Sequence, residues 1–280
     1  MTQRREKPAG PFPLPRLSGE LATRILSALL LALLALGAAY LGGPILALFW
    51  LVAGFAVLVE WLTIARVEPR RVLIWLLGAA LALLTVVGMA SAGAGPALLV
   101  VAAALTGCLF LGRSGRDRAW AAAGFGYAAV ISLVPPAIRY QPDTGLTWLL
   151  WMFAIVWTTD VAAYFAGRRF GGPKLWGRIS PKKTWSGFAG GLLGGTLAGC
   201  AVIQLALGEW DDRPGLAAVA AVSALASVAS QLGDLAESAL KRQFEVKDSG
   251  HIIPGHGGVM DRVDGFWAVA ALAGLWLLFT

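Results

Sequence analysis

The sequence predicts an all-α fold, a polytopic transmembrane bundle of about nine spanning helices, from three observations. The 280 residues are 58% hydrophobic and 14% charged, with a mean hydropathy of +0.70, whereas a soluble domain carries about a quarter charged residues. Apolar runs of about 20 residues, the length that crosses a bilayer, recur along the chain. Lys and Arg are distributed very unequally between alternate connecting segments, which is typical of multi-pass membrane proteins.

The expected spans follow the apolar runs in chain order. We place them at 23–41, 44–65, 72–92, 95–112, 119–138, 146–167, 187–208, 215–234 and 265–280. The eighth is rich in Ala and Ser, so we expect it inside the bundle, and the ninth is short. In the seventh, glycines recur every four residues from Gly187 to Gly199. Such a stripe lets helix backbones approach closely, and we interpret it as packing; a homodimer is a further expectation.

The positions of the basic residues predict the orientation. With the N-terminus in the cytoplasm, the outer hairpins hold only Arg139 and Arg213, and the other 21 of the 23 basic residues lie on the inner side, as the positive-inside rule requires. The net charge of +7 therefore arises from loops, and no nucleic-acid partner is expected. We expect a multi-pass protein of a bacterial cell (inner) membrane with its active site facing the cytoplasm.

The same pattern divides the chain into three parts. A cytoplasmic tail occupies residues 1–22, N-terminal transmembrane helices occupy 23–145, and a C-terminal catalytic region occupies 146–280. Two polar loops, 168–186 and 235–264, belong to the last part and share the cytoplasmic face, where cytosolic nucleotides and ions can reach both.

Reactive side chains concentrate near the C-terminus. Four acids, four basic residues and both histidines lie between positions 238 and 264. The residues 230–242 read as the cytoplasmic end of the eighth helix, and Asp234, Glu237, Ser238 and Lys241 share one helical face there. An acid in or beside a spanning helix is costly and therefore a functional candidate. A structural Asp–Lys ion pair at the membrane edge is the alternative.

The glycine-rich stretch 254–258 (PGHGG) suits an anion. Its backbone N–H groups can fold around a phosphate, and the carboxylates of Asp261 and Asp264 follow at once. Carboxylates beside a phosphate site suggest Mg²⁺, with substrate phosphates completing its ligand shell. The basic side chains available to neutralise phosphate are Lys241, Arg242, Lys247 and Arg262. The alternative is a solvated glycine turn with scattered charges.

The two histidines have different expected roles. His256 lies between glycines and suits a phosphate contact or a general acid, whereas His251 suits a structural or exposed position. A zinc site formed by both is disfavoured, because they are five residues apart across a Pro-Gly break and no thiol is nearby.

The loop 168–186 carries a second set of polar residues. Asp160 and Tyr164 precede it on one helical face. Residues 180–184 (SPKKT) place two lysines beside hydroxyl groups, which suits a polyphosphate. Contact of these lysines with anionic lipid headgroups is the alternative.

These residues closely resemble the signature of the phosphatidate cytidylyltransferase (CDP-diacylglycerol synthase) family, S-x2-K-R-x4-K-D followed by P-x-H-G-G-x2-D-R-x-D. It stands intact as Ser238, Lys241, Arg242, Lys247, Asp248, Pro254, His256, Gly257, Gly258, Asp261, Arg262 and Asp264. Asp160, Tyr164, Gly167, the 180–184 stretch and Gly233-Asp234 match as well. The resemblance covers roughly residues 150–275, and the first 140 match only as generic apolar helices. One position departs: Ser186 stands where the family usually has Glu.

The resemblance implies a reaction and a set of roles. CTP and phosphatidate, a membrane lipid, would give CDP-diacylglycerol and pyrophosphate with Mg²⁺ as cofactor, and a second cation is compatible with the acids. Asp234 and Asp261 are the expected metal ligands, followed by Asp264 and Asp248. The implied phosphate-binding residues are Lys241, Arg242, Lys247 and Arg262, with His256 beside them. The implied nucleotide-binding residues are Ser180, Lys182, Lys183, Thr184, Gly257 and Gly258. A Glu at position 186 that held nucleotide or cation would be missing, so weaker activity is expected in that case.

Three other functions compete with this interpretation. A CTP-dependent kinase of a lipid alcohol would transfer the γ-phosphoryl group and release CDP. A CDP-alcohol phosphotransferase is disfavoured, because its acidic D-G-x2-A-R run is absent and Asp264-Gly265 is followed by Phe266. A transporter or scaffold whose loops bind anionic lipid would tolerate Asp234→Asn and Asp261→Asn.

Overall fold

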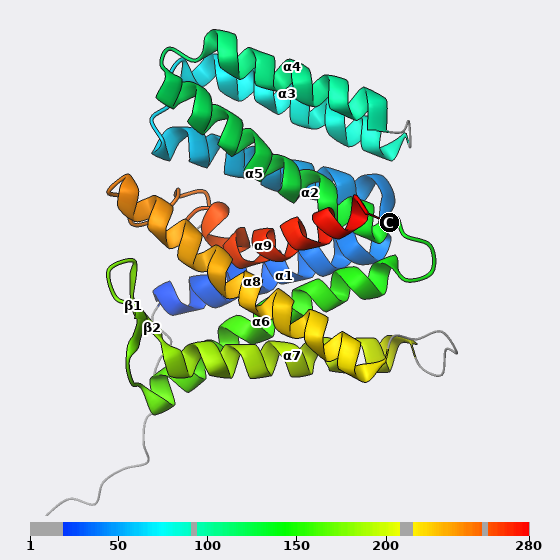
Figure 1. The fold of residues 1–280 in the computed structure, drawn as a ribbon, viewed down its shortest axis with the longest axis vertical. Coiled ribbons are helices and arrows are strands. Elements are labelled where there is room, and N and C mark those ends of the chain that lie inside the picture. Colours follow the sequence, from blue (N-terminus) through cyan, green and yellow to red (C-terminus); the bar gives the residue numbers. More distant parts are fainter. Residues whose placement is uncertain (1–18, 91–93, 208–214, 254–256, 280) are drawn as a thin grey trace, which may run out of the picture.

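The structure, a computed structural model, describes residues 19–90, 94–207, 215–253 and 257–279. Within them the chain forms nine helices and one β-hairpin (Figure 1). The elements are α1 Gly19–Leu41, α2 Gly43–Ile64, α3 Arg70–Met89, α4 Ala94–Leu111, α5 Gly115–Arg139, α6 Gly145–Phe170, β1 Lys174–Trp176, β2 Ser180–Thr184, α7 Trp185–Leu207, α8 Leu216–Gln243 and α9 Met260–Leu277. Each predicted span coincides with one helix. The predicted tail lies almost wholly outside the described residues.

Six of these helices are long and apolar enough to cross a membrane, by length and composition: α2, α3, α5, α6, α7 and α8. The apolar parts of α1 and α4 are shorter, and α9 carries three charged residues in its first two turns. The coarse prediction of an all-α bundle with several spans is therefore confirmed. Nine spans and a cytoplasmic N-terminus stay predictions.

The two polar loops are more ordered than predicted. The loop 168–186 contains an antiparallel hairpin, in which Lys174 pairs with Thr184 and Trp176 with Ser180. In the loop 235–264, α8 continues to Gln243, in agreement with the expected helical end at 230–242, and α9 begins at Met260, five residues before the expected span. Charged residues did not end these helices, because cations are favourable at a helix C-terminus and acids at an N-terminus. The ranges 235–243 and 260–264 are thus helical.

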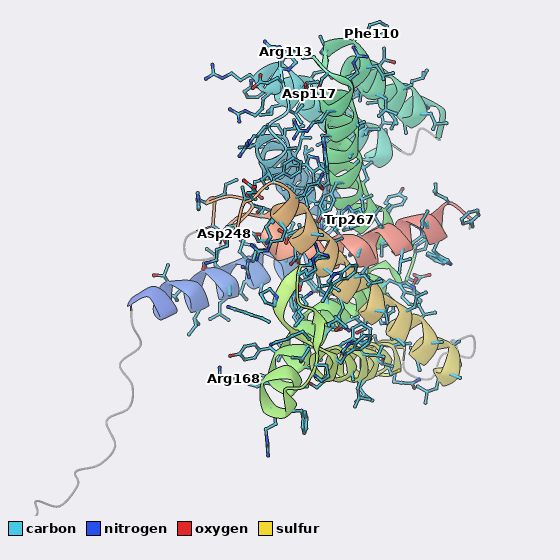
Figure 2. All side chains as sticks on the ribbon, turned by 60° about the vertical axis from the view of Figure 1, so that its left-hand side comes forward. Phe110, Arg113, Asp117, Arg168, Asp248 and Trp267 are labelled. Atoms are coloured by element: carbon cyan, nitrogen blue, oxygen red, sulfur yellow. The ribbon has the colours of Figure 1, made fainter. Side chains whose placement is uncertain are left out.

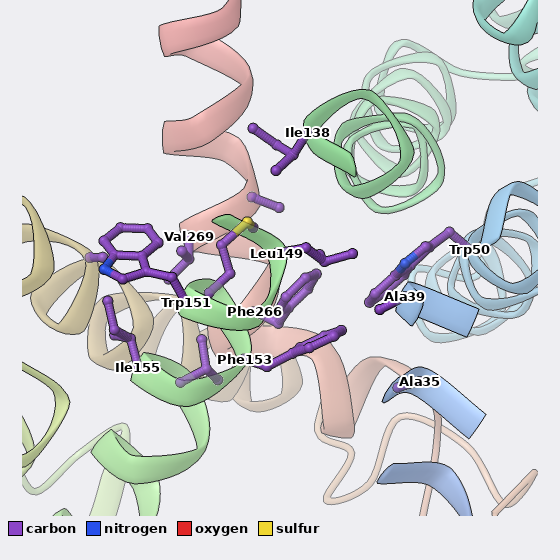
Figure 3. Packing of buried hydrophobic residues seen from close by; sticks show 14 of the residues in the cluster. Ala35, Ala39, Trp50, Ile138, Leu149, Trp151, Phe153, Ile155, Phe266 and Val269 are labelled. Atoms are coloured by element: carbon purple, nitrogen blue, oxygen red, sulfur yellow. The ribbon is translucent and has the colours of Figure 1, made fainter. Parts of the chain in front are cut away.

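The buried core lies around α2, α6 and α9. Trp50 of α2 stacks on Phe266 of α9 with ring centroids 4.8 Å apart, and Phe266 stacks in turn on Phe153 of α6 at 5.2 Å (Figure 3). A second buried cluster joins α2 to α3 and α5 through side chains such as Leu58, Leu73 and Phe125. Because α2 contributes to both clusters, it connects the N-terminal helices to the C-terminal ones.

The glycine stripe of α7 packs against α6. A Cβ atom on Gly190 would lie 2.3 Å from Cβ of Ala166, and one on Gly194 would lie 2.6 Å from Cβ of Ala162. The absence of side chains at these positions is what lets the two backbones approach. The packing interpretation is therefore confirmed. The contacts lie within the chain, and the homodimer stays a prediction.

We expect Gly190→Ala to destabilise the protein by about 1–3 kcal/mol, because the added methyl group overlaps Ala166 and forces α6 and α7 apart. Gly126→Ala on α5 is the matched control, since a Cβ atom there has no neighbour within 4 Å. Thermal unfolding in detergent, followed by tryptophan fluorescence, should give a lower Tm for Gly190→Ala only. Equal Tm values for the two variants would contradict the close packing.

Candidate active site

The β-hairpin and the α8–α9 loop lie at the same end of the bundle (Figure 1). Nζ of Lys183 on β2 is 2.6 Å from Oδ2 of Asp234 on α8. Nε of Arg242, near the end of α8, donates to the carbonyl oxygen of Ile179 at 3.4 Å. The two polar segments, which sequence reasoning assigned to one face, are therefore in direct contact.

Asp261, at the start of α9, organises the loop that precedes it. Its Oδ1 lies 2.7 Å from Nζ of Lys241, and its Oδ2 accepts hydrogen bonds from the backbone N–H groups of Ser249 and Gly258, both at 2.9 Å. The same ammonium group is 2.7 Å from Oε2 of Glu237. Both carboxylate oxygens of Asp261 are thus engaged within the protein.

These contacts determine the charge of Asp261. Burial by itself would raise the pKa of this carboxyl group, but the Lys241 ammonium and the two backbone N–H groups outweigh it and lower the pKa to about 2. Asp261 is therefore a stable anion. It can bind a cation only if Lys241 or a backbone donor moves away, so its predicted role as a metal ligand stays a prediction with that condition.

A second group of acids lies beside Lys183. Asp234 of α8, Asp264 of α9 and Asp160 of α6 interact electrostatically, and burial together with the charges of Asp234 and Asp160 raises the pKa of Asp264. Lys183 opposes this effect. Within the described residues, no three His, Cys, Asp or Glu side chains form a preformed metal site.

This crowding of carboxyl groups fits a divalent cation, because a bound cation would favour their ionised form. Mg²⁺ is usually held by one or two carboxylates, with substrate phosphates and water filling the remaining positions. Asp234 forms an ion pair with Lys183 and accepts from the Ser238 hydroxyl at 3.5 Å, and Oδ1 of Asp264 accepts from the N–H of Gly265. We expect these two carboxylates to be the ones that can turn to a cation.

The other predicted residues fall into two sets. Lys182, Arg242, Lys247, Asp248 and Arg262 are exposed, and Figure 2 shows Asp248 on the α8–α9 loop. In contrast, Thr184 is buried, and its Oγ1 accepts from the N–H of Gly187 at the start of α7 (3.1 Å), while Ser180 is partly buried at the end of the hairpin turn.

The glycine-rich stretch is only partly described. Gly257 has φ +84° and pairs with Ile253 in an isolated β-bridge, and the N–H of Gly258 points to Asp261. That donor is therefore used inside the protein. Pro254, Gly255 and His256 lie outside the described residues, so the phosphate-binding arrangement and the role of His256 stay predictions.

Comparison with known proteins now decides the family. The model of the Cytidylyltransferase family matches residues 22–279. The chain belongs to this cytidylyltransferase family. A protein of Brucella suis biovar 1 (strain 1330) named "Phosphatidate cytidylyltransferase" is 41% identical over 259 residues, which cover 90% of this chain and 91% of that protein. A protein of the same name from Bacillus subtilis (strain 168) is 43% identical over 129 residues, 46% of each chain.

The cytidylyltransferase match extends beyond the region in which the sequence alone showed a resemblance. It includes the N-terminal helices, and one residue of these helices contacts the signature region in the structure. Glu60 of α2, with 3% of its surface exposed, accepts hydrogen bonds from Oγ of Ser249 and from the N–H groups of Val259 and Met260. Sequence reasoning missed Glu60, although a lone acid inside the apolar run 44–65 was a signal that it has a partner.

Ser186 stands at the position where the family resemblance predicted Glu. Its hydroxyl group donates to the carbonyl oxygen of Gly171, which follows α6, and lies 3.0 Å from Oγ1 of Thr184. The side chain therefore connects the end of α6 to the start of α7, and both of its hydrogen bonds are made there rather than with the acids of the site.

We expect Asp261→Asn to lower the free energy of unfolding by about 2 kcal/mol at pH 7. The pKa of Asp261 falls from about 3.9 in the unfolded chain to about 2 in the folded protein, so the anion stabilises the fold above pH 4. This stabilisation is lost as the pH falls from about 4 to 2, and the difference between the two proteins should shrink with it.

Urea unfolding at several pH values measures this difference. Asp248→Asn in the same loop is the control, because the Asp248 side chain is exposed. A constant difference between Asp261→Asn and the unaltered protein from pH 7 down to pH 3, or an equal loss in Asp248→Asn, would contradict the assigned role.

Proposed function

We propose that this chain is a multi-pass membrane transferase that converts CTP and phosphatidate to CDP-diacylglycerol and pyrophosphate. Family membership and two similar proteins named phosphatidate cytidylyltransferase support the reaction. The observation that carries it is the ion pair of 2.6 Å between Lys183 and Asp234. This contact places the segment 180–184, whose two lysines suit a polyphosphate, beside the acids that suit a cation.

The chemistry requires positioning more than a strong base. The second pKa of a phosphate monoester is about 6, so phosphatidate is largely a dianion at neutral pH. One of its oxygens attacks the α-phosphorus of CTP, a new P–O bond forms, and the bond to the β-phosphate breaks as pyrophosphate leaves. The protein must align two polyanions and relieve their repulsion.

Asp234 and Asp264 are the residues that we propose to hold Mg²⁺, with Asp261 and Asp248 as further oxygen donors. A bound Mg²⁺ supplies positive charge between the phosphates of the two substrates. Asp160 interacts electrostatically with Asp264 and is the carboxyl group that we propose for a second cation.

The remaining predicted residues bind the nucleotide or neutralise phosphate. In this proposal the nucleotide is bound by Ser180, Lys182 and Lys183 of the hairpin. Arg242, Lys247 and Arg262, which are exposed around the α8–α9 loop, neutralise phosphate charge. Lys241 acts through Asp261, because its ammonium group is held between two carboxylates. His256 is proposed as a phosphate contact or general acid.

The proposed setting is a bacterial cell (inner) membrane. Six helices suited to spanning support a multi-pass protein. Both polar segments lie at one end of the bundle, and the cytoplasmic face is proposed for that end because CTP is a cytosolic nucleotide. A lipid substrate would enter sideways from the same leaflet.

Pyrophosphate release by the detergent-purified protein tests the reaction. CTP, phosphatidate and Mg²⁺ are each omitted in turn. We expect release only when all three are present, with CDP-diacylglycerol appearing in the lipid phase. Release of CDP in a parallel reaction with a lipid alcohol in place of phosphatidate would instead indicate γ-phosphoryl transfer to that alcohol, and no turnover by a folded protein would contradict the proposal.

We expect Asp234→Asn to lower kcat by at least about 100-fold, because the substitution removes an anion from the proposed cation site and the partner of Lys183. His251→Ala is the control, since His251 is exposed on the loop and should keep near-normal turnover. Turnover retained in a folded Asp234→Asn protein would argue for a lipid-binding scaffold.

A further inference from the structure

Glu60 is a buried acid outside the signature residues. It lies in an otherwise apolar helix, where an unpaired carboxylate would be very costly. Its Oε2 accepts from Oγ of Ser249 at 3.0 Å and from the N–H of Met260 at 2.8 Å, and its Oε1 accepts from the N–H of Val259 at 2.8 Å. All three donors belong to the α8–α9 loop and the start of α9, about 190–200 residues further along the chain.

These bonds replace a missing helix cap. The first N–H groups of a helix have no intrahelical acceptor, and a Ser, Thr, Asp or Asn side chain usually supplies one. The residue before α9 is Val259, which forms no side-chain cap hydrogen bond. Glu60 supplies the acceptor from α2, and a carboxylate at this end is also favourable to the helix dipole.

Ser249 connects Glu60 to the signature. Its hydroxyl group donates to Glu60, whereas its backbone N–H donates to Asp261. Gly250 and Gly258 leave room for the same carboxylate: a Cβ atom on Gly250 would lie 2.7 Å from Oε1 of Glu60, and one on Gly258 would lie 2.6 Å from Oε2. Glu60 therefore holds the loop at two places, at position 249 and at positions 259–260.

We propose that Glu60 is a positioning residue for cytidylyl transfer. By fixing the start of α9 and the base of the loop, it sets where Asp261, Arg262 and Asp264 lie relative to α8. This inference rests on the proposed function, and it gives the N-terminal helices a part in a site whose signature lies entirely in the C-terminal half.

Glu60→Gln is the variant that tests the inference. The amide keeps the size of the side chain, but its NH₂ group must face one of the donors that Glu60 now accepts from. Asp117→Asn is the matched control. Asp117, at the start of α5, is also a buried acid of the N-terminal half. Its carboxylate accepts hydrogen bonds from Oγ of Ser114 and from the N–H of Glu68. Figure 2 shows it far from Asp248 and the α8–α9 loop.

The kinetic expectation separates positioning from general stability. Displacing catalytic groups by about 1 Å can cost about 100-fold in rate. We expect kcat to fall about 10- to 100-fold in Glu60→Gln, with KM for CTP changed less than about 3-fold, measured at a temperature where both variants are folded. Asp117→Asn should keep kcat within about 3-fold. Equal kcat losses in the two variants, or an unchanged kcat in Glu60→Gln, would overturn the inference.

A double-mutant cycle tests the link through Ser249. Ser249→Ala removes one of the three hydrogen bonds to Glu60 but leaves the backbone contact with Asp261 in place. Because both substitutions alter the same set of contacts between Glu60 and the loop, their effects on kcat should be less than additive. Strictly additive effects would show that Ser249 and Glu60 act separately and would overturn this link.

Amide hydrogen exchange provides a readout that needs no turnover. Peptides covering residues 249–260 should exchange faster in Glu60→Gln than in the unaltered protein, and at the unaltered rate in Asp117→Asn. This result would support the role of Glu60 in holding the loop even if the protein failed the pyrophosphate assay. Failure of the proposed function and failure of this positioning role can therefore be told apart. Unchanged exchange in Glu60→Gln would overturn the positioning role.

Discussion

The cost of burying charge among apolar helices is the constraint on which the candidate site depends. Lys241 is placed between Glu237 and Asp261, whose side chains are 2% and 7% exposed. In such a cluster the opposite charges compensate each other, and removal of one member leaves the others uncompensated. The ammonium group of α8 therefore fixes the first turn of α9, and the remaining oxygen of Asp261 fixes the loop between them.

The same requirement separates the acids of the site into two kinds. Asp261 and Glu60 have their oxygens filled by donors of the protein and serve to shape the loop. Asp234 and Asp264 have fewer donors and lie near Asp160, so carboxyl groups are crowded there. The first kind of acid shapes the loop, whereas the second kind contacts Lys183 of the hairpin and is the proposed place for a cation.

The helices could be predicted from the sequence because hydrophobic run length and the distribution of Lys and Arg are local signals. The hairpin could not, since residues 180–184 are short and polar and lack the alternation of a strand. The start of α9 at Met260 was missed because the charged residues 261–264 were taken to precede the span. Glu60 was missed for a different reason: its three partners lie far away in sequence, and only tertiary contact assigns them.

The cap that α2 supplies to α9 has a consequence for biogenesis. During synthesis α2 is made about 190–200 residues before Ser249 and Met260, which donate to Glu60 in the folded protein. Until these residues emerge, Glu60 lacks those hydrogen bonds. A translation intermediate without α9 therefore lacks the contacts that fix the loop and cannot contain an assembled site.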